Sequence, residues 1–130
     1  MKRKYLIAAA LAAAPIAGQP AVAAPRLEIT GQTRATPQLQ RDVLARIAAY
    51  SSQTGGCHML FSAHMAVMPR SFVPRQPTKP ATTLGGHFEI WTVNACAAKQ
   101  RFQIAMWPSP RGGADYAITP LTGRMSLLTR

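Results

Sequence analysis

Acidic residues are scarce in this chain, whose 130 residues include 4 Asp plus Glu against 15 Lys plus Arg, a net charge of +11. Cysteine is limited to two residues. No apolar run reaches the roughly 20 residues of a membrane-spanning helix. Together with the chain length, these shortages exclude a multidomain enzyme, a large cofactor-binding fold and a transmembrane protein. The sequence also lacks a G-x-S-x-G motif, a phosphate-cradling glycine loop and an H-E-x-x-H motif.

The beginning of the chain is typical of a secretory signal peptide. A basic start at residues 2–4 precedes an apolar stretch over 5–14 and a small-x-small cleavage site, Ala-Val-Ala, at 21–23. We therefore predict a signal peptide over 1–23 and a single secreted α+β domain over 24–130, which is periplasmic or secreted. Without the three leader cations, the domain keeps 12 basic and 4 acidic residues, a net charge of +8.

The two cysteines are predicted to form one internal disulfide between Cys57 and Cys96, because an exported domain folds in an oxidising compartment. The alternative is a reactive Cys57 thiol with the adjacent His58 as its base. Neighbouring residues on a strand point to opposite faces, which places that pair badly for proton transfer. The sequence has no C-x-x-C motif and no Cys/His spacing typical of zinc, so no metal and no other cofactor are predicted.

One amphipathic helix is predicted over residues 37–53. Thr36 followed by Pro37 is a favourable helix start, since threonine caps a free amide and proline is tolerated in the first turn. Apolar side chains then recur at helical spacing, and the glycine pair at 55–56 supplies the stop.

Strands are predicted on both sides of the helix. Residues 26–30 form a short edge strand that ends at Gly31. Residues 57–68 alternate with a period of two, which predicts a strand with one face in the core. A helix is the alternative for 57–68, because methionine and alanine favour helices. The apolar row contains Cys57, Met59, Phe61, Ala63, Met65 and Val67.

The second half of the domain is predicted to be a strand meander over 87–96, 101–107 and 114–119, with a last short strand near 125–128. Residues 69–83 contain four prolines and are predicted to form an irregular connection, without a regular helix or a central strand. The fold class that satisfies these faces is α+β, with one amphipathic helix packed on an antiparallel sheet of about four to five strands.

The stretch from Glu89 to Cys96 has the pattern E-x-W-x-V-x-x-C and is followed by the segments 102–104 and 112–113. This pattern resembles that of small exported proteins of unknown function in Gram-negative bacteria, over about residues 84–119. Many of those proteins have glycine after the cysteine, where this chain has Ala97. The resemblance implies export and a β-rich core, and it implies no chemistry.

The histidines and carboxylates give no predicted catalytic or metal site. His58 and His64 would lie about 20 Å apart on a strand, too far for one metal ion. Glu89 is predicted to form a cross-strand ion pair with Arg101. The remaining carboxylates, in particular Asp115, have ordinary surface and turn positions.

The positive charge indicates an anionic partner, either an envelope component or a protein. Ten of the twelve basic residues of the exported domain are arginines, which suit bidentate contacts with phosphate or carboxylate. They are dispersed along the sequence. Nucleic-acid binding is not expected, because export removes the usual target and because basic and aromatic residues are not interleaved.

Two tryptophans and two arginines are the predicted binding residues. Trp91 and Trp107 lie opposite the clearest apolar rows of their strands, and Arg101 and Arg111 are close to them in sequence. An exposed face of the meander would present these rings to a partner. Coverage of that face by the proline-rich connection, residues 69–83, is the alternative.

The leading interpretation of the sequence is a small secreted or periplasmic binding domain without enzymatic activity. The alternative is a small envelope hydrolase that uses Glu89 or Asp115 with a histidine. A deep pocket that unites a carboxylate with an imidazole would favour the hydrolase, whereas a shallow convex sheet face would favour binding.

Overall fold

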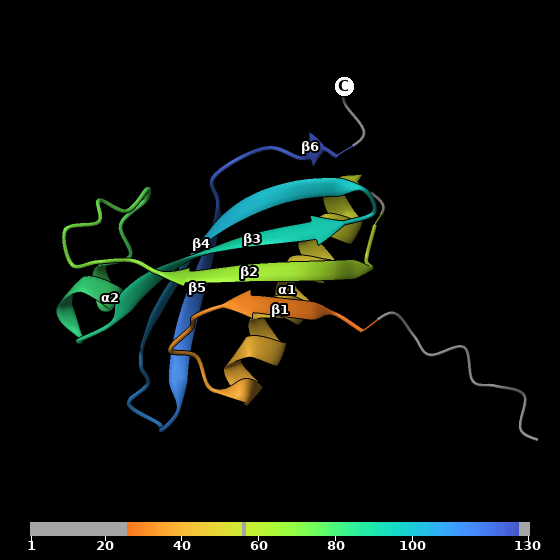
Figure 1. Ribbon diagram of the computed structural model, residues 1–130. Helices are drawn as coiled ribbons and strands as arrows, with labels where there is room; N and C mark the ends of the chain where they lie inside the picture. The colour runs from red at the N-terminus through yellow and green to blue at the C-terminus, as the bar shows by residue number, and fades with distance from the viewer. Residues whose placement is uncertain (1–25, 56, 128–130) are drawn as a thin grey trace, which may run out of the picture.

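The computed structural model describes residues 26–55 and 57–127. The predicted signal peptide, 1–23, lies outside the described residues. The helix α1 lies across one face of the sheet, and α2 lies with the preceding loop at one end of it (Figure 1). The elements in chain order are β1 (Glu28–Gly31), α1 (Pro37–Gly55), β2 (Leu60–Val67), α2 (Lys79–Thr83), β3 (His87–Ala95), β4 (Ala98–Pro108), β5 (Ala114–Pro120) and β6 (Met125–Ser126).

All of these strands belong to one sheet with the order β1-β2-β3-β4-β5, and β6 pairs with the first residues of β4. The strands β2 to β5 form an antiparallel meander, as predicted. The strand β1 instead runs parallel to β2. Parallel neighbours need a crossover, and α1 is that crossover. The predicted α+β fold is confirmed, with a parallel edge strand as the one departure from an antiparallel sheet.

The helix α1 begins where the sequence predicts and extends two residues further, to Gly55. Thr36 Oγ1 accepts a hydrogen bond from the backbone N–H of Leu39 at 3.2 Å, which satisfies one free amide of the first turn. One side of the helix is buried against the sheet and contains Leu39, Val43, Leu44, Ile47 and Ser51.

The hydrophobic core lies between α1 and the helix-facing side of the sheet. Trp91 in β3 and Phe102 in β4 are opposite each other in the register, and they are 0% and 1% exposed. The ring of Tyr50 in α1 packs edge-on against Phe102, with centroids 5.8 Å apart. Large aromatic rings dominate the apolar area of a small core, so these three rings link α1 to the centre of the sheet.

The strand β2 confirms the strand predicted within residues 57–68 over a shorter range, and the helical alternative is wrong. Ala63 and Met65 are buried as predicted, whereas Phe61 is exposed. The pairing with β3 shifts register just after Leu60. A bulge of this kind turns the preceding residues over, so Leu60 packs against the core in place of Phe61.

The proline-rich connection packs on the sheet face that α1 leaves free. The backbone N–H of Arg75 donates to Gln103 Oε1 at 2.8 Å, and Gln103 Nε2 donates to the backbone carbonyl of Arg75 at 2.7 Å. Gln103 is 1% exposed. The ring of Phe72 also contacts Phe88 in β3, with centroids 6.0 Å apart. Both faces of the middle of the sheet are therefore covered.

The expectation that residues 69–83 form no helix is wrong at the end of the segment, where α2 forms. Pro80 lies in the first turn of α2. The amides of a first turn have no partner within a helix, so a proline there breaks no hydrogen bond. Pro80 therefore does not prevent the short helix, which ends just before Gly85 and its φ of 72°.

Cys57 and Cys96 form a disulfide with Cα atoms 6.1 Å apart. The predicted pairing is confirmed, and the alternative of a reactive Cys57 thiol is wrong, since no described cysteine is free. The bridge ties the segment before β2 to the turn between β3 and β4. Cys96 and Ala97 form that turn with φ angles of 45° and 59°. A two-residue hairpin turn of the favoured type requires this left-handed conformation.

Candidate functional site

A buried carboxylate is the centre of the candidate site. Glu89 in β3 is 0% exposed. Its Oε2 accepts a hydrogen bond from the backbone N–H of Arg34 at 3.0 Å and lies 2.6 Å from Nε2 of His87. Its Oε1 accepts from the indole N–H of Trp91 at 3.0 Å, and the hydroxyl of Thr33 also bonds to this carboxylate. Donors from the β1–α1 loop and from β3 therefore converge on one side chain.

These donors keep Glu89 charged. Burial alone would raise the pKa of Glu89, because a low-dielectric environment penalises the carboxylate. The hydrogen bonds from Thr33, Trp91, His87 and Arg34 outweigh burial and hold the pKa below its ordinary value of 4.5. An ionised carboxylate only accepts hydrogen bonds, so Nε2 of His87 carries the proton of their contact.

The predicted ion pair between Glu89 and Arg101 does not form. In the register of β3 and β4, Glu89 is opposite Ile104, whereas Arg101 is opposite Thr92. The two-residue turn fixes this register, and it puts Glu89 on the face toward α1 and Arg101 on the other face. In residues 26–55 and 57–127, the one close contact between an acidic and a basic side chain joins Glu89 Oε2 to Nε2 of His87, and it is an ion pair when the imidazole is protonated.

His87, the first residue of β3, lies where two clefts meet, and we call the two clefts together the His87 site. The larger cleft, of about 550 Å³, lies between the proline-rich connection and the start of β3. The smaller one, of about 200 Å³, extends to the turn between β4 and β5. His87, Arg34, Gly85 and Gly86 line both clefts. The His87 side chain is 17% exposed, so the imidazole forms part of the wall of each cleft.

The floor of the His87 site depends on glycine. A Cβ at Gly86 would lie 2.2 Å from the backbone oxygen of Met106 and 2.8 Å from that of Ala81. The amide of Gly86 also donates to the carbonyl of Ala81 at 3.1 Å. Gly85 has a φ of 72°, a conformation that glycine adopts without steric cost. The missing Cβ at Gly86 therefore lets the segment after α2 lie close against the backbone of β4.

The lining of the His87 site is cationic. Arg34 and Arg70 are among the residues that line the larger cleft beside His87, and no aspartate or glutamate lines either cleft. Neither arginine has a carboxylate partner in the part of the chain that the structure describes. The carboxylate of Glu89 is buried beneath the surface of the clefts and is stabilised there by its own hydrogen-bond donors. An anion that enters the site would therefore meet uncompensated positive charge.

The residues predicted to bind a partner do not share one surface. Trp91 is 0% exposed and donates to Glu89, so the exposed alternative is wrong for this ring, which is covered by α1 rather than by the proline-rich connection. Both faces of β3 are covered, so both of its rows contain apolar residues. The sequence of β3 therefore does not indicate which row faces the helix. Trp107 lies on the opposite face and lines the smaller cleft. Arg111 is exposed in the turn that follows Trp107. Arg101 is exposed on β4, six residues before Trp107.

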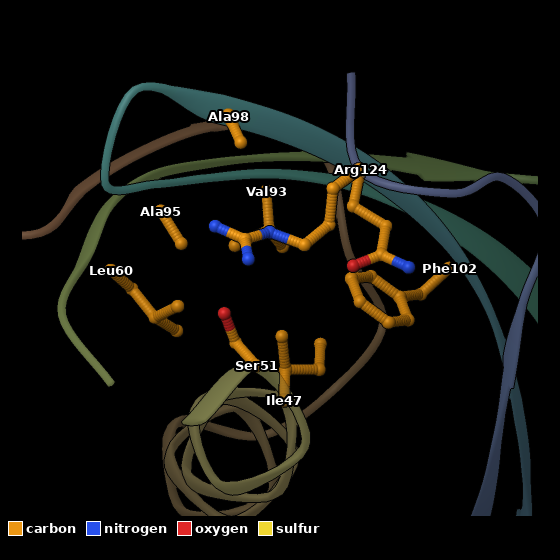
Figure 2. Close-up of a pocket in the computed structure, with 9 residues that line it drawn as sticks. Ile47, Ser51, Leu60, Val93, Ala95, Ala98, Phe102 and Arg124 are labelled. Carbon is orange, nitrogen blue, oxygen red and sulfur yellow. The ribbon is translucent and has the colours of Figure 1, made fainter. Parts of the chain in front are cut away.

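A separate cavity lies inside the core at the C-terminal end of α1 (Figure 2). Ile47, Ser51, Val93 and Phe102 are among its lining residues, and the Arg124 side chain reaches into it from the C-terminal segment. Its volume is about 10 Å³, the space of one water molecule at most. This cavity is too small for a ligand larger than a water molecule.

The described residues contain no group of three His, Cys, Asp or Glu side chains that could hold a metal ion. His64 Nδ1 instead lies 2.9 Å from the hydroxyl of Thr30. None of the helices within residues 26–55 and 57–127 combines the length and the apolarity of a membrane span. Asp115, the other candidate acid of the hydrolase alternative, is exposed opposite Trp107.

His87 and Arg34 are not among the predicted binding residues. The H-x-E spacing does place His87 and Glu89 on one face of a strand, and this signal could have identified the pair. The contact of Arg34 with Glu89 has no signal in the sequence, because the backbone amide of Arg34 makes it and any residue type has such an amide except proline. That contact depends on how the β1–α1 loop passes over β3.

Comparison of the chain with protein-family models, with curated proteins and with solved structures gave no match. The resemblance to small exported Gram-negative proteins therefore stays a prediction. The function of the His87 site is argued below from its geometry and charge.

Proposed function

We propose that this protein is a secreted or periplasmic binding domain that holds a small anionic ligand, or the anionic group of a larger envelope component, in the His87 site. The cationic lining carries the proposal: Arg34 and Arg70 line the larger cleft beside His87, and no acidic residue lines it. A guanidinium group offers paired N–H donors in the geometry that phosphate and carboxylate accept. The cleft volume of about 550 Å³ is within the usual range of small-ligand sites.

The charge balance of the whole domain supports the same class of ligand. The exported domain has a net charge of +8, which attracts anions over a distance before contact. The disulfide and the predicted signal peptide support a location in an oxidising compartment outside the cytoplasm. Ligands of that compartment include phosphorylated and carboxylated components of the envelope.

The experiment is a titration of the mature protein with inorganic phosphate and with acetate, followed by NMR chemical shifts. We expect saturable shifts of the His87 ring and of residues 85–88. The double variant Arg34→Gln with Arg70→Gln should weaken phosphate binding by about tenfold or more, because a hydrogen bond to a charged group contributes roughly 1.5–3 kcal/mol.

The matched control is the double variant Arg101→Gln with Arg111→Gln, which removes the same charge from the sites predicted from the sequence. We expect it to bind phosphate as the wild type does, apart from a small effect of net charge. An equal loss in both double variants would contradict the proposal, because it would show attraction to net charge rather than a site. A loss in the control alone would move the site to those two arginines.

A hydrolase remains the second candidate, since the structure brings a carboxylate and an imidazole within 2.6 Å at a cleft wall. Glu89 would orient His87 and stabilise its protonated form, and His87 would remove a proton from water as the water oxygen attacks an ester carbonyl. The same proton would then pass to the leaving alkoxide. Ester hydrolysis that His87→Phe abolishes and His64→Phe leaves unchanged would support this candidate.

A further inference from the structure

The His87 ring presents one unpaired acceptor to the His87 site. Its Nε2 is committed to Glu89 Oε2 at 2.6 Å. Its Nδ1 has no hydrogen-bond partner among the described residues. The one buried side-chain N or O atom that lacks a partner there is Asn94 Oδ1, so Nδ1 of His87 is open to solvent rather than enclosed. A neutral imidazole with its proton on Nε2 has a lone pair on Nδ1, which accepts a hydrogen bond.

We propose that the ligand of this site carries a hydroxyl group beside its anionic group, with Nδ1 of His87 accepting a hydrogen bond from that hydroxyl while Arg34 and Arg70 hold the anion. This inference rests on the proposed binding function and specifies its ligand as a hydroxylated anion, that is, a hydroxy acid or a hydroxylated phosphate ester. In it, Glu89 is a positioning residue that does not touch the ligand.

The contacts of Glu89 bring the two kinds of recognition together. Its Oε2 bonds both to the backbone N–H of Arg34, at 3.0 Å, and to Nε2 of His87, at 2.6 Å. The Arg34 backbone and the His87 ring therefore lie on either side of one oxygen atom. Both residues also line both clefts. We place the anion in the clefts that Arg34 and His87 both line, where a hydroxyl close to the anionic group is the part of the ligand that reaches Nδ1.

The ionised state of Glu89 makes this recognition specific. A carboxylate that only accepts hydrogen bonds holds an N–H of His87 on Nε2, so in the neutral imidazole the lone pair is on Nδ1 and is available to the ligand. A ligand without a donor beside its anionic group would leave Nδ1 desolvated and unpaired. Sites built in this way discriminate against analogues that lack the matching donor.

Two pairs of probes differ only by one hydroxyl: lactate against propionate, and 2-hydroxypropyl phosphate against propyl phosphate. Binding is measured by NMR shifts and by calorimetry on the mature disulfide-bonded protein. We expect the wild type to bind one hydroxylated probe about five- to tenfold more tightly than the matching probe without the hydroxyl, which is the effect of one hydrogen bond. The pair that shows the larger ratio distinguishes a hydroxy acid from a phosphate ester.

The variant His87→Phe keeps a planar ring and removes Nδ1, and we expect its ratio between the paired probes to fall to about one. His64→Phe is the matched control, because His64 lies exposed on the outer face of β2 and should keep the wild-type ratio. If His87→Phe does not fold, long-range proton–nitrogen NMR spectra of the wild type identify the ring nitrogen that carries the proton and so test the inference directly. A proton on Nδ1 would overturn the inference.

The two proposals fail in different ways. A wild-type ratio of one for both pairs, with binding that still depends on Arg34 and Arg70, would overturn the hydroxyl contact and leave the anion site in place. Absence of saturable binding by all four probes and by phosphate would overturn the proposed function as well.

Discussion

Replacing Glu89 by alanine should destabilise the fold strongly, because this buried side chain is the common acceptor for four donors. The indole N–H of Trp91 is the most affected donor, since Trp91 is 0% exposed and has no access to solvent. A buried donor left without a partner costs about 1–3 kcal/mol. The amide of Arg34 and the ring of His87 border the clefts and can bond to water instead.

We therefore expect Glu89→Ala to lower the free energy of unfolding by about 3–5 kcal/mol, the range for removal of one partner from a buried charged network. Small domains have a total of roughly 5–15 kcal/mol, so the variant should be marginal. Trp91→Phe keeps most of the apolar ring and removes one hydrogen bond to a charged group. Its expected cost is about 1.5–3 kcal/mol, with a coupling of similar size to Glu89 in a double-mutant cycle.

The assay is urea denaturation followed by far-UV circular dichroism, because tryptophan fluorescence would itself change in the Trp91 variant. A loss below about 1 kcal/mol for Glu89→Ala would refute the reasoning, since exposed substitutions alone reach about half that value. It would mean that water replaces the carboxylate as the acceptor, and that solvent reaches this position more easily than the 0% exposure of Glu89 indicates.

The pH dependence gives an independent check on the charge of Glu89. Its folded pKa is lower than its ordinary value of 4.5, so the folded state favours the ionised form. The stabilisation is complete above about pH 4.5 and is lost as the pH falls through the folded pKa. The urea midpoint of the wild type should therefore fall with acidification below that pH. Glu89→Gln should lack this part of the fall, and an identical acid profile for both proteins would contradict an ionised Glu89.

Two further predictions concern the turn between β3 and β4. The double variant Cys57→Ser with Cys96→Ser should lose about 4 kcal/mol of stability in urea unfolding, because the bridge closes a loop of 39 residues; a loss close to zero would show that the unfolded chain is already constrained there. Ala97→Gly should raise the urea midpoint slightly, because Ala97 has a φ of 59° that costs an L-residue about 1–2 kcal/mol, part of which is offset by the flexibility of glycine. A lower midpoint would place the stabilisation of the turn in the Ala97 side chain.

The sequence alone predicts the elements that have a strong local pattern. The helix over 37–53 follows from the Thr36-Pro37 start and the apolar spacing, and the structure differs only by two residues at its end. The disulfide follows from the number of cysteines and the compartment. These predictions succeed because each depends on neighbouring residues or on a count, and no long-range contact has to be known.

The predictions for the tryptophans and for Glu89 depend on which face of the sheet packs against the helix. The sequence gives the wrong face for Trp91 and the wrong cross-strand partner for Glu89. Residues on both faces of β3 are apolar, because α1 covers one face and the proline-rich connection covers the other. The alternation of residues along β3 then has no clearly polar face, so the pattern does not indicate which face of the strand is toward the helix. The bulge after Leu60 causes the same error in β2, where Phe61 is exposed.

The sequence by itself determined the helix, the strand meander, the pairing of the cysteines and the excess of positive charge. Only the tertiary structure decided that Glu89 is buried, that it bonds to His87 and the backbone of Arg34, and that two clefts meet at that histidine. Local patterns are set by residues a few positions apart. The candidate site joins a loop before α1 to a strand 55 residues later, and the folding of the whole sheet brings them together.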